Sequence, residues 1–342
     1  MRAIALRLFL LGTLFAATVH PGPAQAQSTP HPALVVLNKD ANELAIVNPQ
    51  SLQVVGRVPT GDIPHEVAVS DDGKLAVATN YGPGMKGTTL TIIDLDAQKG
   101  RTFSLLNVVG SQGEKYGDLI GPHGVQFFDG KFYFTAEGTH KIARYNPAND
   151  KVDLVVPIDQ NRTHMLIVLK RVYVIFTSNV NSNSVTAVWP NRDGGDWNHT
   201  TIPVGKGPEA IDASPDNTEV WVGNSGDGTV SIINPDAKKV TETSSVGAKH
   251  SNRLKFTPDG KFVYVSDMGT GDLVVVDAKS RKVVNRVKLG SSAEGILMQP
   301  DGSRIYVAVS GDNKVVIVDP HTQAVINSIA TGKDPDGMAW RP

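Results

Sequence analysis

Short runs of β-branched and aromatic residues, separated by clusters of turn residues, make up most of the chain. Examples are residues 262–265 (FVYV) and 304–307 (RIYV), each of which closely follows an Asp-Gly pair. Short apolar runs bounded by such turns are typical of antiparallel strands joined by hairpins. After the N-terminal region, no segment shows the 3.6-residue apolar period of a helix. The pattern therefore predicts an all-β protein.

The turn residues recur with a regular period. A strand that ends in a turn of the Asn-Pro or Asp-Pro type returns about every 43 residues, which is the length of a four-stranded propeller blade. The copies lie at residues 47–49, 93–95, 145–147, 188–190, 233–235, 276–278 and 318–320. A second marker, Asp followed by Gly or Asn, begins at Asp72, Asp129, Asp216, Asp259 and Asp301. The repeat predicts a β-propeller.

The two ends of the chain are expected to share one blade. The innermost strands are predicted to begin near Pro64, Pro122, Thr163, Pro208, Ser251, Ala293 and Pro335. The last of these has no room for three further strands, whereas strands at 33–37, 43–47 and 53–58 have no innermost partner. We therefore expect the C-terminal strand to pair with the N-terminal strands, which closes a ring of seven antiparallel blades and removes its open edges. Residues 27–342 would form this single domain.

Three segments carry a resemblance to a known family. Residues 259–267 (DGKFVYVSD), 221–224 (WVGN) and 75–80 (LAVATN) resemble the YVTN repeat. Over almost all of residues 27–342, the chain resembles exported seven-bladed propellers of the YncE-like group. The resemblance implies the propeller fold. Because that group includes both binding proteins and lactonase-like enzymes, it leaves the function open.

The N-terminus resembles a secretory signal peptide. Arg2 and Arg7 precede an apolar segment at 8–17, and residues 24–26 (AQA) form a cleavage site. We expect cleavage after Ala26 and export to the periplasm or the medium. The apolar segment is too short to cross a bilayer, and no later segment approaches that length, so no membrane span is expected.

Composition excludes several other classes of protein. The chain has 342 residues, no cysteine and a formal net charge of -1. The absence of cysteine excludes disulfides, thiolate metal sites and c-type haem attachment. Near-neutral charge without basic clusters argues against binding to nucleic acid. We expect a monomer.

One residue in each blade is predicted to face the mouth of the central channel, at the start of the innermost strand. These ring residues are His65, His123, His164, Glu209, Glu294 and Asp336, with His250, Ser251 or Asn252 as the seventh. Glu137 ends a second strand and is expected to reach the same mouth. Arg253 is a further candidate, although the alternation of side chains along its strand directs it toward a neighbouring blade.

Two hypotheses follow for this ring. In the first, the mouth binds a small molecule or a protein partner through the whole set of candidates. That set is His65, His123, Glu137, His164, Glu209, His250, Arg253, Glu294 and Asp336. Insertions at 81–88 and 104–121 lie on the same face and could form a lid or a partner surface.

The second hypothesis is a divalent metal centre, with zinc, copper or calcium as the ion. Imidazoles with a carboxylate are common metal ligands, and the ligand set would be His65, His123, His164 and Glu209. Such a centre would serve a hydrolase or lactonase with His123, His164 and Glu209 as catalytic candidates, or a copper redox site. No sequence motif identifies the cofactor or the substrate.

Overall fold

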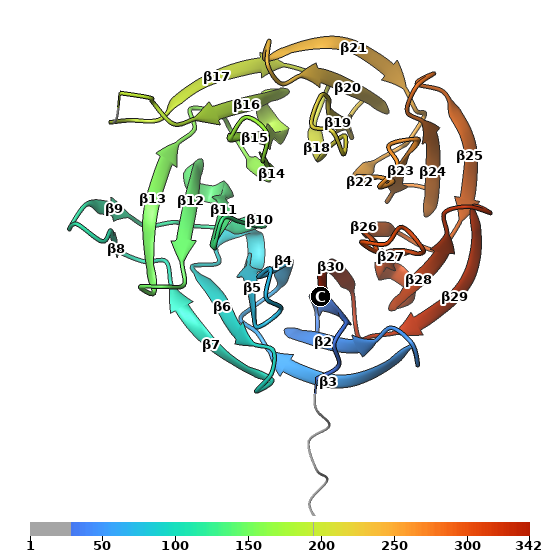
Figure 1. Cartoon of the computed structure of the whole chain (residues 1–342), viewed down its shortest axis with the longest axis horizontal. Coiled ribbons are helices and arrows are strands. Elements are labelled where there is room, and N and C mark those ends of the chain that lie inside the picture. Colours follow the sequence, from blue (N-terminus) through green and yellow to red (C-terminus); the bar gives the residue numbers. More distant parts are fainter. Residues whose placement is uncertain (1–28, 194) are drawn as a thin grey trace, which may run out of the picture.

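A computed structural model describes residues 29–193 and 195–342, and these residues form seven four-stranded antiparallel sheets around a central channel (Figure 1). The predicted seven-bladed β-propeller is thus confirmed. The signal peptide predicted at 1–26 lies outside the described residues. Among the residues that are described, no helix combines the length and the apolar character needed to cross a membrane.

Each blade runs from an innermost strand at the channel to an outermost strand at the rim. The first three blades in chain order are β1 (Ala33–Asn38), β2 (Glu43–Asn48) and β3 (Gln53–Pro59) with β30 (Pro335–Arg341); β4 (Pro64–Val69), β5 (Leu75–Asn80), β6 (Thr89–Asp94) and β7 (Lys99–Ser104); and β10 (Pro122–Phe128), β11 (Lys131–Ala136), β12 (Lys141–Asn146) and β13 (Lys151–Pro157). The next two are β14 (Thr163–Leu169), β15 (Val174–Asn179), β16 (Ser184–Trp189) and β17 (Asn198–Pro203); and β18 (Pro208–Ala213), β19 (Val220–Asn224), β20 (Thr229–Asn234) and β21 (Lys239–Ser245). The last two are β22 (Ser251–Phe256), β23 (Phe262–Asp267), β24 (Asp272–Asp277) and β25 (Val283–Lys288); and β26 (Ala293–Met298), β27 (Ile305–Val309), β28 (Lys314–Asp319) and β29 (Ala324–Ala330).

The ring closes through the pairing of β1 with β30, as the sequence predicts. The two strands run antiparallel, with Val35 opposite Ala339, and β1 pairs with β2 on its other side. At the innermost position the neighbouring blade comes very close, because a Cβ added to Gly337 would lie 2.2 Å from the carbonyl oxygen of His65. Only glycine allows β30 and β4 to approach in this way.

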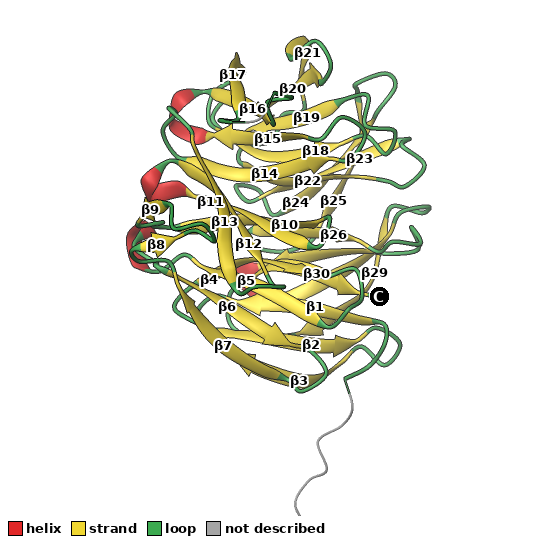
Figure 2. Cartoon of the chain, turned by 60° about the vertical axis from the view of Figure 1, so that its left-hand side comes forward, coloured by secondary structure: helices red, strands yellow, loops and turns green. Residues whose placement is uncertain are grey.

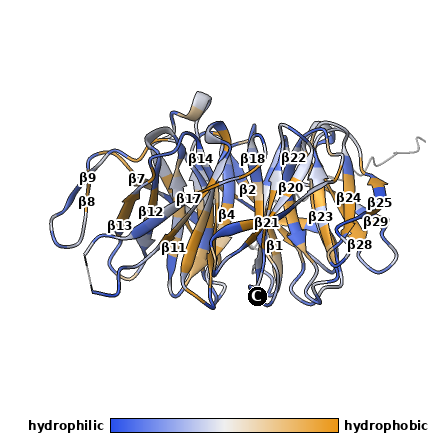
Figure 3. Ribbon diagram, turned by 90° about the horizontal axis from the view of Figure 1, so that it is seen from above, coloured by the Kyte–Doolittle hydropathy of each residue, from blue (hydrophilic) through white to orange (hydrophobic). Residues whose placement is uncertain are grey.

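Apolar side chains fill the space between neighbouring blades. The described residues form seven buried clusters, one for each pair of adjacent blades. In one of them, Val77 and Leu90 pack against Phe132 and Phe134 of the next blade. Figure 3 shows the hydrophobic residues concentrated within the strands and the hydrophilic residues in the turns. The blades therefore hold one another in place without any disulfide.

Short turns and the two insertions lie on the face that carries the channel mouth. The 3-10 turns η1 (Pro83–Met85), η2 (Glu137–Thr139) and η3 (Val180–Ser182) gather along one side of the disc in Figure 2. A further turn, η4 (Ser310–Asp312), follows β27. The insertion at 104–121 forms a hairpin of β8 (Val108–Val109) and β9 (Lys115–Gly117), which the sequence did not predict.

Every innermost strand contains a β-bulge directly after its first residue. In β10, Pro122 pairs with Ala136, but the next paired residue is Val125, opposite Phe134. Three steps on one strand therefore match two on the other. A bulge of this kind interrupts the alternation of side chains and re-aims the residues beside it.

Hydroxyl groups of the second strand satisfy the backbone N–H groups that these bulges free. The four donor–acceptor pairs are Glu66 N to Thr79, Gly124 N to Thr135, Met165 N to Ser178, and Arg253 N to Ser266. Three of the hydroxyls then donate to a ring residue of the next blade, at 2.6 Å from Thr79 to the His123 carbonyl, 2.6 Å from Thr135 to His164 and 3.0 Å from Ser178 to Glu209. The second strand of one blade thus positions the ring residue of the next.

The buried hydroxyl of Thr135 is expected to contribute to stability through both of these bonds. Thr135→Val keeps the shape but leaves a buried N–H and a buried carbonyl unpaired, which should lower the free energy of unfolding by about 1–3 kcal/mol. Thr135→Ser, which retains the hydroxyl, should lose less. Urea denaturation measures both, with the exposed Thr201→Val as control. Equal losses in Thr135→Val and Thr135→Ser would contradict this role.

Candidate functional site

All seven ring positions line a single cavity of about 170 Å³ at the channel mouth. The seven side chains come from the second residue of each innermost strand: His65, His123, His164, Glu209, Asn252, Glu294 and Asp336. Asn252 therefore occupies the position that the sequence left open between three neighbours. Ser251 is fully buried as the first residue of β22.

His250 directly precedes β22, and its side chain contacts the ring residue Glu209. Its Nε2 lies 2.9 Å from Oε2 of Glu209, and Asn252 donates to Oε1 of the same carboxylate at 3.0 Å. Asp267 fixes the backbone here, because it accepts the N–H groups of Lys249 and His250 at 2.9 Å each. The hydrogen bond to Glu209 raises the pKa of His250.

Three imidazole rings from consecutive blades form an arc along one side of the cavity. The ring centroids of His65 and His123 are 4.8 Å apart, and those of His123 and His164 are 3.9 Å apart. Burial, together with the nearby cations Lys39 and Arg253, lowers the pKa of His65 to about 3. Burial also lowers the pKa of His123 well below its usual range. Both rings are therefore neutral near neutral pH.

His164 differs from its two neighbours because carboxylates flank it. Its Nδ1 lies 3.4 Å from Oε2 of Glu137, and its Nε2 lies 3.6 Å from Oε1 of Glu209. Burial acts to lower the pKa of His164, but the two carboxylates outweigh burial and raise it. The pKa of Glu209 is in turn held low by His164 and His250, against the effect of burial.

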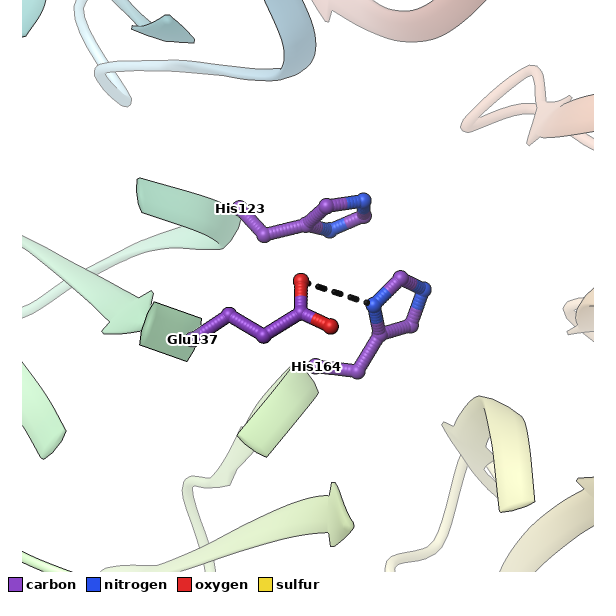
Figure 4. Close-up of side chains that lie close together, drawn as sticks. All are labelled: His123, Glu137 and His164. Carbon is purple, nitrogen blue, oxygen red and sulfur yellow. Dashed lines mark hydrogen bonds and ion pairs between the residues drawn. The ribbon is translucent and has the colours of Figure 1, made fainter. Parts of the chain in front are cut away.

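Glu137 lies behind the imidazole arc, at the first position of η2, and its side chain is buried. Arg162 Nε donates to its Oε1 at 2.5 Å. Figure 4 shows the carboxylate directed toward His123 and His164. One ligand atom from each of these three residues lies within 4.8 Å of the others, so they could hold a metal ion. This group contains Glu137 in place of the His65 and Glu209 of the ligand set predicted from sequence.

The acidic side of the ring is paired with a lysine that sequence reasoning missed. Lys39 Nζ lies 2.5 Å from Glu294, 3.4 Å from Asp336 and 3.5 Å from Asp334. Burial acts to lower the pKa of Lys39, but these carboxylates outweigh it and raise the pKa. Asp336 Oδ2 also lies 3.4 Å from Nδ1 of His65. Lys39 belongs to a β-turn between β1 and β2, so the ring positions gave no signal for it.

Arg253 points into the channel, and the expectation that it faces a neighbouring blade is wrong. Its Nε donates to Oε1 of Glu66 at 2.8 Å, and its terminal nitrogen bonds the same oxygen. The bulge in β22 causes the difference, because it offsets the alternation on which the expectation depended. The signal was present in the repeat. The third residue of the innermost strand is uncharged in five blades, and it is Glu66 in β4 and Arg253 in β22. The five uncharged residues are Gly124, Met165, Ala210, Gly295 and Gly337.

The Glu66–Arg253 ion pair crosses the channel below the mouth. The two side chains come from β4 and β22, which lie on opposite sides of the ring in Figure 1. Arg253 lines the mouth cavity, and both residues line a second cavity of about 470 Å³, formed by the more distant parts of the innermost strands. The ion pair therefore separates the mouth cavity from the rest of the channel.

These features define a class: a seven-bladed YVTN-type propeller with a polar, histidine-rich cavity at one channel mouth. The chain belongs to the YNCE-like β-propeller family, whose family model matches residues 148–339, just over half of the chain. This result confirms the family suggested by the YVTN-like segments.

Solved structures share the fold at low sequence identity. A functionally unknown protein from Desulfotomaculum acetoxidans has a TM-score of 0.73 and 14% identity, over 90% of this chain and 98% of that one. A protein from Lactobacillus plantarum has a TM-score of 0.71 and 11% identity, over 90% and 99%. The periplasmic gluconolactonase of Pseudomonas aeruginosa has a TM-score of 0.70 and 15% identity, over 91% and 99%. No curated protein matches the sequence significantly.

The neutral state of His65 predicts a pH dependence of stability. In the unfolded chain His65 takes up a proton below about pH 6.5, whereas in the folded protein it does so only near pH 3. The contribution of neutral His65 to the free energy of unfolding is thus fully present above pH 6.5, and it is lost as the pH falls toward 3. Between pH 6 and 4, the free energy of unfolding should fall more steeply than in His65→Asn, by up to about 1.4 kcal/mol per pH unit. Urea denaturation tests this, and parallel profiles would contradict it.

The ion pair across the channel predicts strongly non-additive mutations. Glu66→Gln leaves the buried Arg253 without its counter-charge and should cost about 3–5 kcal/mol of stability. Adding Arg253→Met removes the unpaired charge, so the double variant should be more stable than Glu66→Gln alone. The free energies of unfolding of the two single variants and the double variant measure the coupling. If the single effects simply add, the ion pair has no energetic role.

Proposed function

We propose that this protein is an exported propeller that binds one small, hydroxyl-rich ligand in the mouth cavity. The observation that carries the proposal is a set of buried polar atoms that have no hydrogen-bond partner within the described residues. Besides Nε2 of His164, which faces the Glu209 carboxylate at 3.6 Å, the unpartnered atoms at the mouth cavity are Nδ1 of His123, Oδ1 of Asn252 and Oδ1 of Asp336. Their residues are 2%, 6% and 2% exposed, respectively, and all three line the cavity.

These atoms favour a ligand that donates hydrogen bonds. The amide oxygen of Asn252 and the carboxylate oxygen of Asp336 can only accept, and the neutral ring of His123 can accept on one nitrogen. A buried acceptor without a donor carries an energetic cost, which a ligand hydroxyl would remove. A simple anion is disfavoured, because it carries the same charge as the surrounding carboxylates and has no hydrogen-bond donor to offer them.

The size of the cavity points to a small ligand. Drug-sized molecules occupy pockets of about 300–1,000 Å³, and the mouth cavity is smaller than that range. A sugar lactone or a related polyol combines small size with several hydroxyl donors. The name of one structural neighbour, a periplasmic gluconolactonase, is compatible with this class of ligand, although the similarity itself concerns the fold.

Lactone hydrolysis is a second candidate, favoured by the grouping of His123, Glu137 and His164. Water would add to the lactone carbonyl, the ring C–O bond would break, and the ring oxygen would take up a proton. An efficient general base has a pKa near the working pH, whereas His65 and His123 have strongly lowered pKa values. A metal ion held by this group would instead activate the water.

Export supports the same proposal from the sequence side. Arg2, Arg7, the apolar segment at 8–17 and the AQA site are the parts of a cleavable signal peptide. A mature protein without cysteine is suited to an oxidising compartment. Purification from the periplasmic fraction, with the N-terminus beginning at Gln27, would support export.

Ligand binding predicts a rise in the thermal unfolding midpoint of the mature, metal-stripped protein. Glucono-δ-lactone at 100 times the Kd should stabilise it by about 2.7 kcal/mol, whereas acetate, which has no hydroxyl, should not. Asp336→Asn should weaken the effect at least tenfold in Kd, because it alters the unpartnered carboxylate.

Asp334→Asn is the matched control, because Asp334 also contacts Lys39 but does not line the cavity. The lactone and a panel of small polyols are tested side by side. If none of them raises the midpoint, or if the two Asn variants behave alike, the proposal is wrong.

A further inference from the structure

We propose that His123, Glu137 and His164 bind one first-row divalent transition metal of the zinc type, with its open position facing the mouth cavity. The inference deepens the proposed function and rests on it in one respect, since the ion and the small ligand would share the cavity. The ligands come from two neighbouring blades: His123 and His164 lie at the starts of β10 and β14, and Glu137 begins η2, directly after β11.

One edge of the required coordination polyhedron is already present. Metal–ligand bonds of 2.0–2.2 Å place neighbouring ligand atoms of a tetrahedral site about 3.4 Å apart. His164 Nδ1 and Glu137 Oε2 lie 3.4 Å apart. The third ligand atom, from His123, is within 4.8 Å of both, so a movement of up to about 1.4 Å by this side chain would complete the site.

His123 packs against the rings of His65, Tyr81 and His164, but no hydrogen bond anchors its Nδ1. Its Nδ1 is buried and has no hydrogen-bond partner, so turning the ring breaks no bond from this atom. Its backbone, in contrast, is held by the hydroxyl of Thr79 at 2.6 Å. A fixed backbone and an unpartnered ring nitrogen are expected of a histidine that ligates a metal ion.

The groups around the three ligands act as a second shell. Arg162 holds Oε1 of Glu137 and leaves Oε2 directed toward His164. Glu209 faces the outer nitrogen of His164, Nε2, at 3.6 Å. A carboxylate on the outer nitrogen of a ligating histidine fixes the ring and increases its basicity. Glu209 is thereby a positioning residue and not a ligand.

The donor set selects the kind of metal. Two imidazoles and one carboxylate suit zinc and the ions near it in the first transition row. Calcium takes six to eight oxygen ligands, which these three residues do not offer. Three protein ligands leave a fourth position for water or a ligand hydroxyl, as in catalytic zinc sites.

The test is a calorimetric titration of chelator-treated mature protein with zinc chloride. One zinc ion per chain is expected, and a tenfold excess of calcium should not displace it. Glu137→Gln and His123→Ala should each lower the zinc affinity by more than about 100-fold, beyond the 10–100-fold effect of losing a second-shell partner. Glu209→Gln should fall within that 10–100-fold range, and His199→Ala, an exposed histidine on β17, should have no effect.

Cobalt(II) provides a second readout that does not depend on activity. Its visible spectrum should show a four-coordinate site in the wild type and lose this signature in Glu137→Gln. Thermal unfolding of each metal-free variant establishes that it is folded. If His123→Ala does not fold, Glu137→Gln alone decides the result.

Two outcomes would overturn the inference: absence of stoichiometric zinc, or a zinc affinity that Glu137→Gln lowers by less than about tenfold while His65→Ala abolishes it. The second would assign the ion to the three-histidine set instead. Failure of this inference and failure of the proposed function are distinguishable, because the polyol measurement uses metal-stripped protein and the zinc titration contains no polyol. Zinc binding without polyol binding would support the metal site and contradict the proposed function. Polyol binding without zinc binding would do the reverse.

Discussion

The hydrogen-bonded pairing of β1 with β30 is the constraint on which the rest of the structure depends. It turns an open row of sheets into a ring, so that seven innermost strands start around a common axis. Without cysteine, no covalent bond can replace it. Closure also assembles the acidic half of the site, since Lys39 follows β1, Asp336 belongs to β30, and both meet at the mouth.

The bulge at the start of each innermost strand then gives the mouth its chemistry. It frees a backbone N–H that a buried hydroxyl accepts, and the same hydroxyl can hold a ring residue of the next blade. Because interruption of the alternation brings a second residue to the channel, Glu66 and Arg253 meet below the ring. The position of the site and the barrier beneath it therefore share one cause.

Charge pairing explains why chemically similar ring residues behave differently. Burial, with nearby cations, lowers the pKa of His65 and of His123, whereas the two carboxylates beside His164 outweigh its burial and raise its pKa. Glu209, Glu294 and Asp336 each form an ion pair with a neighbouring base. Oδ1 of Asp336 nevertheless has no hydrogen-bond partner among the described residues. The cavity is thus a set of satisfied ion pairs with a few acceptors left for a ligand.

The repeat in the sequence by itself determined the number of blades, the strand starts and six of the seven ring residues, because turn chemistry and alternation act locally. It could not assign the seventh position, since one extra residue before β22 left His250, Ser251 and Asn252 equivalent. Only the tertiary structure decided that Asn252 lines the cavity, that Lys39 neutralises the acids, and that Arg253 crosses to Glu66. The physical reason is that bulges and contacts between distant blades depend on how the closed ring brings strands together, which no local pattern records.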